Sequence, residues 1–288
     1  MKIESEAQEM REFENERFTG ERAMFAVKDV KVTDCIFADG ESPFKESHGI
    51  EAVNSSFQWK YPFWYSSDIK ATDCTFFEMA RAGIWYTKNI TLENCLYEAP
   101  KGFRRCDGVT LKNVDLANAS ETLWFNRNVR LENVVAKGTY FAMGSENIYA
   151  ENFRLLGDYS FDGCKNVEIH NAKMLTKDAF WNCENVVVYD SYICGEYFGW
   201  NAKNVKLVNC TIESLQGFCY MDNVVLENCK LLNTTLSFEY STNIDAEVTT
   251  AIDSVKNPYD GSIRAKEIKE LILEDAFVDK NKTKITTL

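Results

Sequence analysis

The chain has few of the residues on which several common kinds of active site depend. It holds only two histidines in 288 residues. His170 falls on a predicted polar face, and for His48, at a predicted bend, the sequence indicates no arrangement with a serine or cysteine partner, so neither predicts a nucleophilic catalyst. No Cys-x-x-Cys pair or cysteine–histidine cluster indicates a metal site. Glycine-rich phosphate loops and the dinucleotide-binding fingerprint are missing as well. We therefore expect no metal and no cofactor.

Long apolar runs are also absent. No stretch approaches the roughly 18 consecutive apolar residues of a membrane span, so we expect no membrane partner. The N-terminal sequence MKIESEAQEMREFENERFTGE is acidic and helix-prone, and it lacks the apolar core of a signal peptide. These features predict a cytoplasmic protein. Cations are outnumbered too: the net charge is −12 and the pI is about 4.8, which argues against nucleic acid as a partner.

Ten cysteines are present, and their positions recur. Five fall six residues after the start of a repeated phrase, and three fall two residues before the next one. Serine and alanine fill the same slots elsewhere, so we expect small buried thiols rather than disulfides. That expectation agrees with a reducing compartment.

The dominant feature of the chain is a phrase that returns about every 19 residues, as in DVKVTDCIF, NITLENCLY and NVKLVNCTI. A fixed period of this size is typical of stacked repeats. The gaps between starting residues are 19, 20 or 21. The starting positions are Asp29, Gly49, Asp68, Asn89, Gly108, Asn128, Asn147, Asn166, Asn185, Asn204, Asn223 and Asn243.

Within each repeat, apolar residues alternate with polar ones over five positions, which predicts a half-buried strand. An Asn or Asp then marks a bend, and two further apolar columns predict two more short strands. The pattern indicates an all-β, right-handed parallel β-helix of about 12 coils of 19–20 residues. A four-sided pentapeptide solenoid is the nearest alternative. We expect an N-terminal cap over residues 1–24, the β-helix over 25–262, and an irregular last coil with a cap over 263–288.

Four phrases carry a family resemblance: GDYSFDGCKNVEIHNA, KDAFWNCENVVVYDSYICGEYFGW, LSFEYST and NPYDGSIRA. They resemble a bacterial family known as domain of unknown function 3737, over nearly the whole chain. The resemblance implies a pectin-lyase-like right-handed β-helix. It brings no established reaction, so no catalytic residue is carried over from it. Assigning the activity of pectin lyases or tailspike glycosidases to this chain would rest on similarity of fold alone.

Five of the six tryptophans lie four residues before a repeat start. Alternation from the apolar neighbouring column places them outside, beside small residues two positions earlier, so we expect a shallow trough lined by indoles. Sugar rings stack on indoles, which predicts an oligosaccharide ligand. A homodimer or cap contact over the same stripe, or burial of the rings, are the alternatives. The predicted ligand-binding residues are Trp64, Trp85, Trp124, Trp181 and Trp200.

Charged residues gather at the middle of this face. Asp158 and Glu196 lie two coils apart with Lys177 between them, so stacking predicts a separation of roughly 9–10 Å. That is near the spacing of an inverting glycosidase, about 6.5–9.5 Å. A surface ladder of alternating charge is the plainer interpretation. The candidate catalytic residues are Asp158, Asp162, Asp178, Glu196 and Arg104.

The predicted function is saccharide recognition or processing on the tryptophan-lined face. Glycoside hydrolysis or elimination is the reaction class if the protein is an enzyme; for elimination, Arg104 or Lys177 could serve as the base. The alternative is a non-catalytic scaffold that uses the same aromatic stripe as a protein interface.

Overall fold

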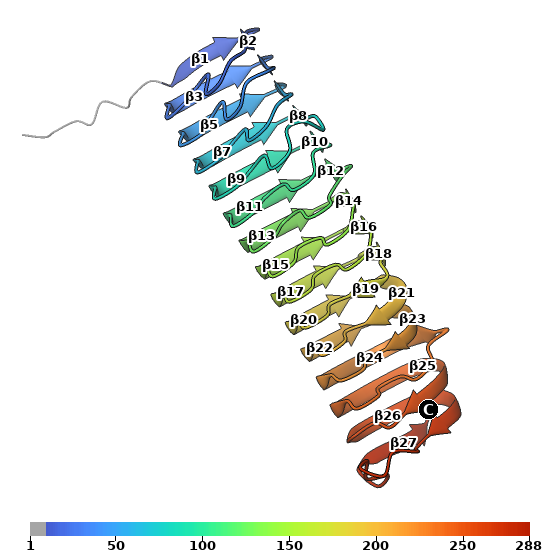
Figure 1. Ribbon diagram of the computed structural model, residues 1–288. Helices are drawn as coiled ribbons and strands as arrows, with labels where there is room; N and C mark the ends of the chain where they lie inside the picture. Colours follow the sequence, from blue (N-terminus) through green and yellow to red (C-terminus); the bar gives the residue numbers. More distant parts are fainter. Residues whose placement is uncertain (1–9) are drawn as a thin grey trace, which may run out of the picture.

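The computed structural model describes residues 10–288. All regular elements in this range are strands, and their pairings are parallel. Figure 1 shows the strands stacked as rungs of a long rod, with the first coil at one end and the last at the other. The prediction of an all-β parallel solenoid is confirmed. No helix of the length and apolarity that a membrane span needs occurs between residues 10 and 288.

The first face, face A, is a continuous parallel sheet with one rung from each coil. Its fifteen rungs in residues 10–288 exceed the twelve expected, because coils are added at both ends. They are β1 (Arg11–Glu14), β3 (Lys28–Thr33), β5 (His48–Val53), β7 (Ser67–Thr72), β9 (Lys88–Glu93), β11 (Asp107–Lys112), β13 (Arg127–Glu132), β15 (Glu146–Glu151), β17 (Lys165–His170), β20 (Glu184–Tyr189), β22 (Lys203–Val208), β24 (Asp222–Leu232), β25 (Thr242–Lys256), β26 (Gly261–Ile272) and β27 (Thr283–Thr287).

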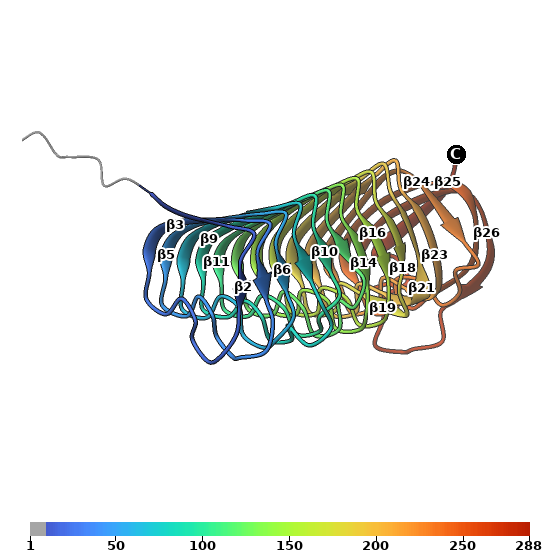
Figure 2. The ribbon, with the colours of Figure 1, turned by 90° about the horizontal axis from the view of Figure 1, so that it is seen from above.

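The second face, face B, carries the shorter strands, which Figure 2 shows along another side of the coils. Their register keeps equivalent residues of successive coils side by side, as in the pairing of Arg154 with Lys173. The strands are β2 (Arg17–Phe18), β4 (Ile36–Phe37), β6 (Ser56–Phe57), β8 (Thr75–Phe76), β10 (Leu96–Tyr97), β12 (Asp115–Leu116), β14 (Val135–Lys137), β16 (Arg154–Leu156), β18 (Lys173–Leu175), β21 (Tyr192–Phe198) and β23 (Thr211–Gly217).

The core consists of columns of like side chains that run along the rod. On face A the alternating pattern puts Val30 and Val32 inside with no exposed surface, and later coils repeat it. On face B, Phe37, Phe57 and Phe76 stack with centroids 5.1 and 4.7 Å apart. Each ring therefore packs on its copy in the next coil, which is an arrangement that aromatic pairs favour. All ten cysteines are free thiols, and all but Cys194 are buried.

Asparagine ladders hold the corner between faces A and B. Asn152 donates a hydrogen bond from Nδ2 to Oδ1 of Asn133 at 2.9 Å, and it accepts one from Asn171 at 2.6 Å. All three residues have positive φ, between 49° and 53°. Asparagine tolerates this left-handed conformation better than most residues, so one residue type supplies both the bend and the ladder. The bend predicted from the sequence is confirmed.

The third side of the coil, face C, differs from the prediction. In most coils from the N-terminus to about residue 145 it is made of turns rather than a third strand, with isolated bridges such as Trp85 to Arg104. Strands reach this side only further along, at β19 (Asp178–Ala179) and at the ends of β21 and β23, which continue from face B. The turns follow from positive φ at residues including Tyr65, Phe103 and Phe125. Each such residue turns the chain locally, because left-handed backbone departs from the extended conformation of a strand.

Both predicted end regions need correction where the structure describes them. β1 pairs in register with β3, Arg11 opposite Val30, so residues 11–24 form a coil and contain no helix. Residues 1–9 of the predicted cap lie outside the described range. At the other end β26 pairs with β25, with one register shift, and β27 pairs with β26. The solenoid therefore continues through most of 263–288 instead of ending at 262.

Candidate functional site

The tryptophan column lies on face C, outside the core, but its rings are half-buried rather than open to solvent. Three of the indoles are tied to the backbone of the next coil. Trp64 donates from Nε1 to the carbonyl of Ala82 at 2.6 Å, and Trp124 donates to that of Tyr140 at 2.6 Å. Trp85 does the same to Lys101 at 2.8 Å. These hydrogen bonds hold the rings against the wall of the rod.

The faces of these rings are occupied by one another. Trp64 and Trp85 stack with centroids 5.2 Å apart and an interplanar angle of 9°. The Arg104 guanidinium lies over both Trp85 and Trp124. A sugar ring stacks on an aromatic face, so the interior of this column offers only ring edges to a ligand. Ring faces become available where the column is interrupted, as at Trp181, which follows Asp162 in the column.

The predicted trough beside the indoles is wrong. The small residues expected to face outward, Gly83, Gly102 and Thr122 among them, are buried. A Cβ added at Gly102 would lie 2.9 Å from the Tyr97 ring, so these residues make room for core side chains. The error arises because alternation was carried through face C. Positive φ at Lys101 and Phe103 breaks the period of two, and neighbouring positions then point the same way.

The predicted charge ladder occupies successive coils, as the spacing required. Asp158 accepts a hydrogen bond from the backbone N–H of Lys177 at 3.0 Å, and the Lys177 ammonium lies 3.4 Å from the Glu196 carboxylate. The hydrogen bond and charge of Glu196 raise the pKa of Lys177, which is the wrong direction for a base. Arg104 is held by Glu121 at 2.5 Å. Asp158, Lys177 and Glu196 are thus engaged with one another, and Arg104 is engaged with Glu121.

Asp178 differs from the other candidates because it is buried, with 3% of its surface exposed. Its Oδ1 has no hydrogen-bond partner. Burial raises the pKa of this carboxyl to about 6, with Glu196 and Asp158 acting in the same direction and Lys177 opposing them. A buried oxygen without a partner costs on the order of 1–3 kcal/mol. Such an oxygen is the kind of group that a ligand can satisfy.

A second unpaired group lies beside it. The Nε1–H of Trp181 is buried and has no acceptor, unlike the indoles of the N-terminal coils. The backbone position that would accept it, equivalent to Tyr140 for Trp124, is Tyr197. Tyr197 belongs to β21, which pairs with β23, so the turn carbonyl used earlier is replaced by a strand. Both unpaired groups line one small hollow, which we call the Asp178 hollow; its lining residues are Tyr159, Ser160, Asp162, Asp178 and Trp181.

The hollow offers few ligands for a metal ion. Asp162 and Asp178 are its only carboxylates, and Asp162 already accepts a hydrogen bond from Asn182 at 2.8 Å. Between residues 10 and 288, no group of three or more His, Cys, Asp or Glu side chains is arranged to hold a metal ion.

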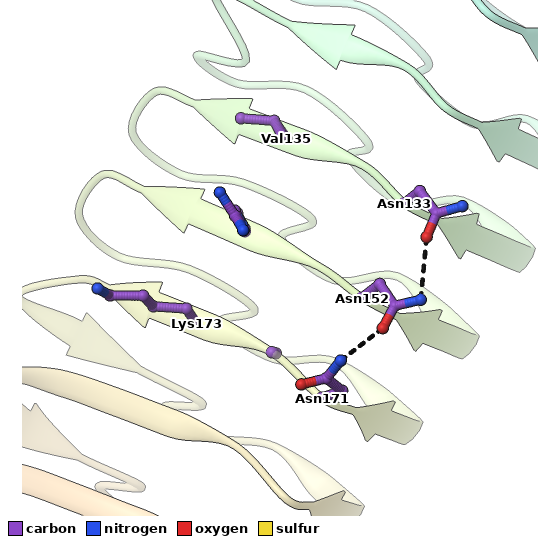
Figure 3. A pocket seen from close by; sticks show the side chains of 7 residues that line it. Asn133, Val135, Asn152, Asn171 and Lys173 are labelled. Atoms are coloured by element: carbon purple, nitrogen blue, oxygen red, sulfur yellow. Dashed lines mark hydrogen bonds between the residues drawn. The ribbon is translucent and has the colours of Figure 1, made fainter.

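Two surface features were missed by sequence reasoning. One is a second aromatic column next to the indoles, where Tyr65, Tyr86 and Phe125 are 52%, 38% and 50% exposed. The residues recur three positions before the repeat starts, but alternation assigned that column inward. The other is a groove on face B beside the asparagine ladder, shown in Figure 3. Its cations Arg154 and Lys173 lie side by side on successive coils. Their equal positions within the 19-residue repeat would have predicted this pair of cations from the sequence.

The fold and this face define a parallel β-solenoid protein with a half-buried aromatic column and one polar hollow. The chain belongs to the family described as "Protein of unknown function (DUF3737)", whose model matches residues 11–286. The resemblance noted from the sequence is thereby confirmed. No curated protein matches the chain.

Solved structures give distant likenesses. PfbA, a surface adhesin of Streptococcus pneumoniae, is 10% identical, with a TM-score of 0.43 over 73% of this chain and 70% of its own. The mannuronan C-5 epimerase AlgE4 A-module of Azotobacter vinelandii is 8% identical, with a TM-score of 0.30 over 96% and 86%. A mutant of the periplasmic alginate epimerase AlgG is 10% identical, with a TM-score of 0.29 over 97% and 75%. At these values the likeness carries no inference about activity.

Proposed function

We propose that the protein recognises a saccharide on face C, with one sugar hydroxyl seated in the Asp178 hollow. The observation that carries the proposal is the pair of unpaired groups there, an acceptor on Asp178 and a donor on Trp181. A hydroxyl donates one hydrogen bond and accepts others, so a single hydroxyl satisfies both. An apolar ligand would leave both groups unpaired at a continuing cost.

The surroundings of the hollow suit the rest of a sugar. Tyr197 meets both Trp181 and Trp200 edge to face, with ring centroids 6.3 Å from each, and the two indoles are 6.1 Å apart and tilted by 38°. Trp200 in turn packs on Tyr220 at 4.8 Å. Rings that meet edge to face leave parts of their faces open, in contrast to the parallel stack of Trp64 on Trp85. Such open faces favour the C–H surface of a pyranose beside the hydroxyl that enters the hollow.

Binding is better supported than hydrolysis or elimination. Asp158 and Glu196 both contact Lys177, and Arg104 lies in the aromatic column three coils from Asp162. A glycosidase needs one carboxyl that holds a proton and another that is free to act as base or nucleophile. Asp178 meets the first requirement, since its pKa is raised to about 6. The other carboxyl of the hollow, that of Asp162, already accepts a hydrogen bond from Asn182, so it does not meet the second requirement.

The test is a glycan array followed by calorimetric titration of the best ligand. Trp181→Phe keeps a ring and removes the N–H, and Trp85→Phe is the matched control, because its indole N–H is already bonded to Lys101. We expect Trp181→Phe to weaken binding about tenfold, the loss of one good hydrogen bond to a ligand, and Trp85→Phe to leave it unchanged. Equal effects of the two variants, or no glycan bound by the native protein, would overturn the proposal.

A protein interface on the N-terminal part of face C is a second candidate. It rests on the exposed column of Tyr65, Tyr86 and Phe125, where Tyr65 and Tyr86 stack with centroids 4.7 Å apart. Exposed aromatic rings are enriched at protein interfaces. Sedimentation of the native protein and of Tyr65→Ser/Phe125→Ser distinguishes the two: a dimer that the double variant abolishes supports a homodimer through this column.

A further inference from the structure

We propose that the groove on face B is a docking site for a short peptide segment of a partner protein that carries both carboxylates and an aliphatic side chain. We call this surface the basic groove. It lies on strands β14, β16 and β18 of face B and shares no lining residue with the Asp178 hollow on face C. Figure 3 shows it beside the asparagine ladder. Its residues are Val135, Lys137, Arg154, Leu156, Lys173 and Leu175.

The charge of the groove is opposite to that of the molecule. The chain carries a net charge of −12, yet Lys137, Arg154 and Lys173 are exposed, and none of them lies within 4.0 Å of a carboxylate of residues 10–288. Nearby cations on face A behave differently: Lys165 contacts Glu184 at 3.6 Å and Arg130 contacts Glu132. The groove therefore concentrates cations that no acidic side chain of the described chain neutralises.

Aliphatic side chains share the surface with these cations. Val135, Leu156 and Leu175 are 46%, 51% and 38% exposed. They lie on consecutive coils, because Val135 pairs with Arg154 while Leu156 pairs with Leu175. Exposed apolar area gathered in one place, with charges around it, is the pattern of an interaction surface. Scattered single leucines would not need this explanation.

The groove holds an elongated ligand of limited length. Its polar part has a volume of about 470 Å³, and an adjoining apolar part has about 240 Å³. Three coils span on the order of 10 Å along the axis, which matches about three residues of extended peptide at roughly 3.3 Å each. The Asn133, Asn152 and Asn171 amides form the wall but are bonded to one another. Recognition is therefore left to the cations and the aliphatic side chains.

This chemistry selects a peptide over other anions. No aromatic ring lines either part of the groove, so a sugar would find no stacking platform there. Three cations are few for a phosphate backbone, whose binding rests on many such contacts. An aliphatic side chain flanked by Asp or Glu buries its apolar part on Leu156 and Leu175 and pairs its carboxylates with Arg154 and Lys173. Guanidinium–carboxylate pairing gives direction as well as attraction.

The experiment uses a fluorescein-labelled peptide of alternating glutamate and leucine, titrated with the full chain by anisotropy. Peptides of glutamate and glycine, and of lysine and leucine, test the two parts of the requirement. Vesicles of phosphatidylserine and phosphatidylcholine test an anionic membrane as the occupant. The variants are Arg154→Gln/Lys173→Gln and Leu156→Ser. The matched control is Lys31→Gln/Lys70→Gln on face A, which changes the net charge equally and breaks no ion pair among the residues that the structure describes.

We expect the glutamate–leucine peptide to bind and the other two to bind at least about tenfold more weakly, because the lysine–leucine peptide loses the charge-assisted contacts and the glutamate–glycine peptide loses the buried leucine. Arg154→Gln/Lys173→Gln and Leu156→Ser should each produce a loss of that size, and the control none. Chemical shift changes in the side-chain amides of Asn133, Asn152 and Asn171 would place the peptide in the groove. Equal loss in the control, binding of vesicles in place of peptides, or no peptide binding would each overturn the proposal.

Discussion

The guanidinium of Arg104 lies between the indoles of Trp85 and Trp124, with its central carbon 4.9 and 4.2 Å from the two ring centroids. Glu121 holds one end of it at 2.5 Å. A planar cation thus fills one position of a column that is otherwise aromatic. Arginine suits this position because its flat group stacks on rings while its N–H groups reach a carboxylate. In this part of the column, stacking therefore joins one coil to the next, and the ring faces are not left free for a ligand.

Replacing Arg104 should therefore affect stability first. Arg104→Lys keeps the charge and loses the flat surface, so we expect a loss of about 1–2 kcal/mol in the free energy of unfolding, the range of a partly desolvated cation–π contact. Arg105→Lys is the control, because Arg105 is exposed and its central carbon lies 5.8 Å from the Phe125 ring. Urea unfolding followed by tryptophan fluorescence measures both. Equal losses would show that stacking between indoles is unimportant.

The asparagine ladder at the corner gives a second prediction. Asn152 both donates to and accepts from its neighbours, and its φ is 53°. Asn152→Gly removes the ladder bonds and keeps the conformation available, whereas Asn152→Ala also forces a Cβ into the left-handed region. We expect Asn152→Ala to be less stable than Asn152→Gly by about 1 kcal/mol, the cost of left-handed backbone for an ordinary residue. Thermal unfolding of the two variants tests this order; the reverse order would contradict the role of φ.

Asp178 gives a prediction about pH. Its pKa rises from 3.8 to about 6 in the folded state because the carboxyl is buried. The folded chain therefore binds this proton more tightly than the unfolded chain, and the stability it contributes is full below pH 4 and lost as the pH rises through about 6. Asp178→Asn has no such proton. We expect the variant to match the native protein near pH 4 and to exceed its stability near pH 7.

Urea midpoints of native and Asp178→Asn protein at pH 4, 5, 6 and 7 give the answer directly. A difference that is constant across this range would mean that Asp178 titrates as an exposed carboxyl does. If a saccharide hydroxyl donates to Asp178, its affinity should also rise over the same pH window in the native protein, since the ionised carboxylate is the better acceptor.

Gly102 and Tyr97 give a prediction about packing. A Cβ on Gly102 would meet only Tyr97 among its nearest contacts, at 2.9 Å from Cε1 and the hydroxyl oxygen. Gly102→Ala should cost about 1–3 kcal/mol, the usual price of overpacking. In the Gly102→Ala/Tyr97→Leu double variant the clash is gone. The loss of unfolding free energy in the double variant should therefore be smaller than the sum of the losses in the two single variants. A double-mutant cycle by urea unfolding measures the coupling, and strict additivity would refute the contact.

Most of the fold could be predicted because the sequence repeats wherever the structure repeats. The starting asparagines, the alternating residues of face A and the bend at positions such as Asn133 all follow one period, and the register of the strands reproduces it. Face C could not be derived in the same way. Positions with left-handed backbone, such as Tyr65 and Phe103, could not be recognised from the sequence, because they hold aromatic residues here and not the glycine that usually marks this conformation. Alternation therefore placed the small residues on the wrong side.

The candidate site follows from the sequence only as a prediction. Asp178 and Trp181 are predicted from charge and from an outward-facing indole, while the structure distinguishes them by burial and missing partners. The Trp181 N–H lacks a partner because the backbone changes from turn to strand around β19 and β21. The turn carbonyl of Tyr140, which accepts from Trp124, has its equivalent at Tyr197, and Tyr197 lies in strand β21. A change of local backbone at one coil leaves no trace in the period of the sequence, so it had to be seen in three dimensions.

The side-chain ladders have one further property, their polarity. In each link between coils, the later asparagine donates and the earlier residue accepts, as in Asn89 to Asp68, Asn209 to Asp190 and Asn243 to Asp222. During synthesis the earlier coil leaves the ribosome first, and it already presents the oxygens that the next coil needs. Growth of the rod can thus follow translation, because each new asparagine finds its side-chain acceptor already in place in the coil made before it.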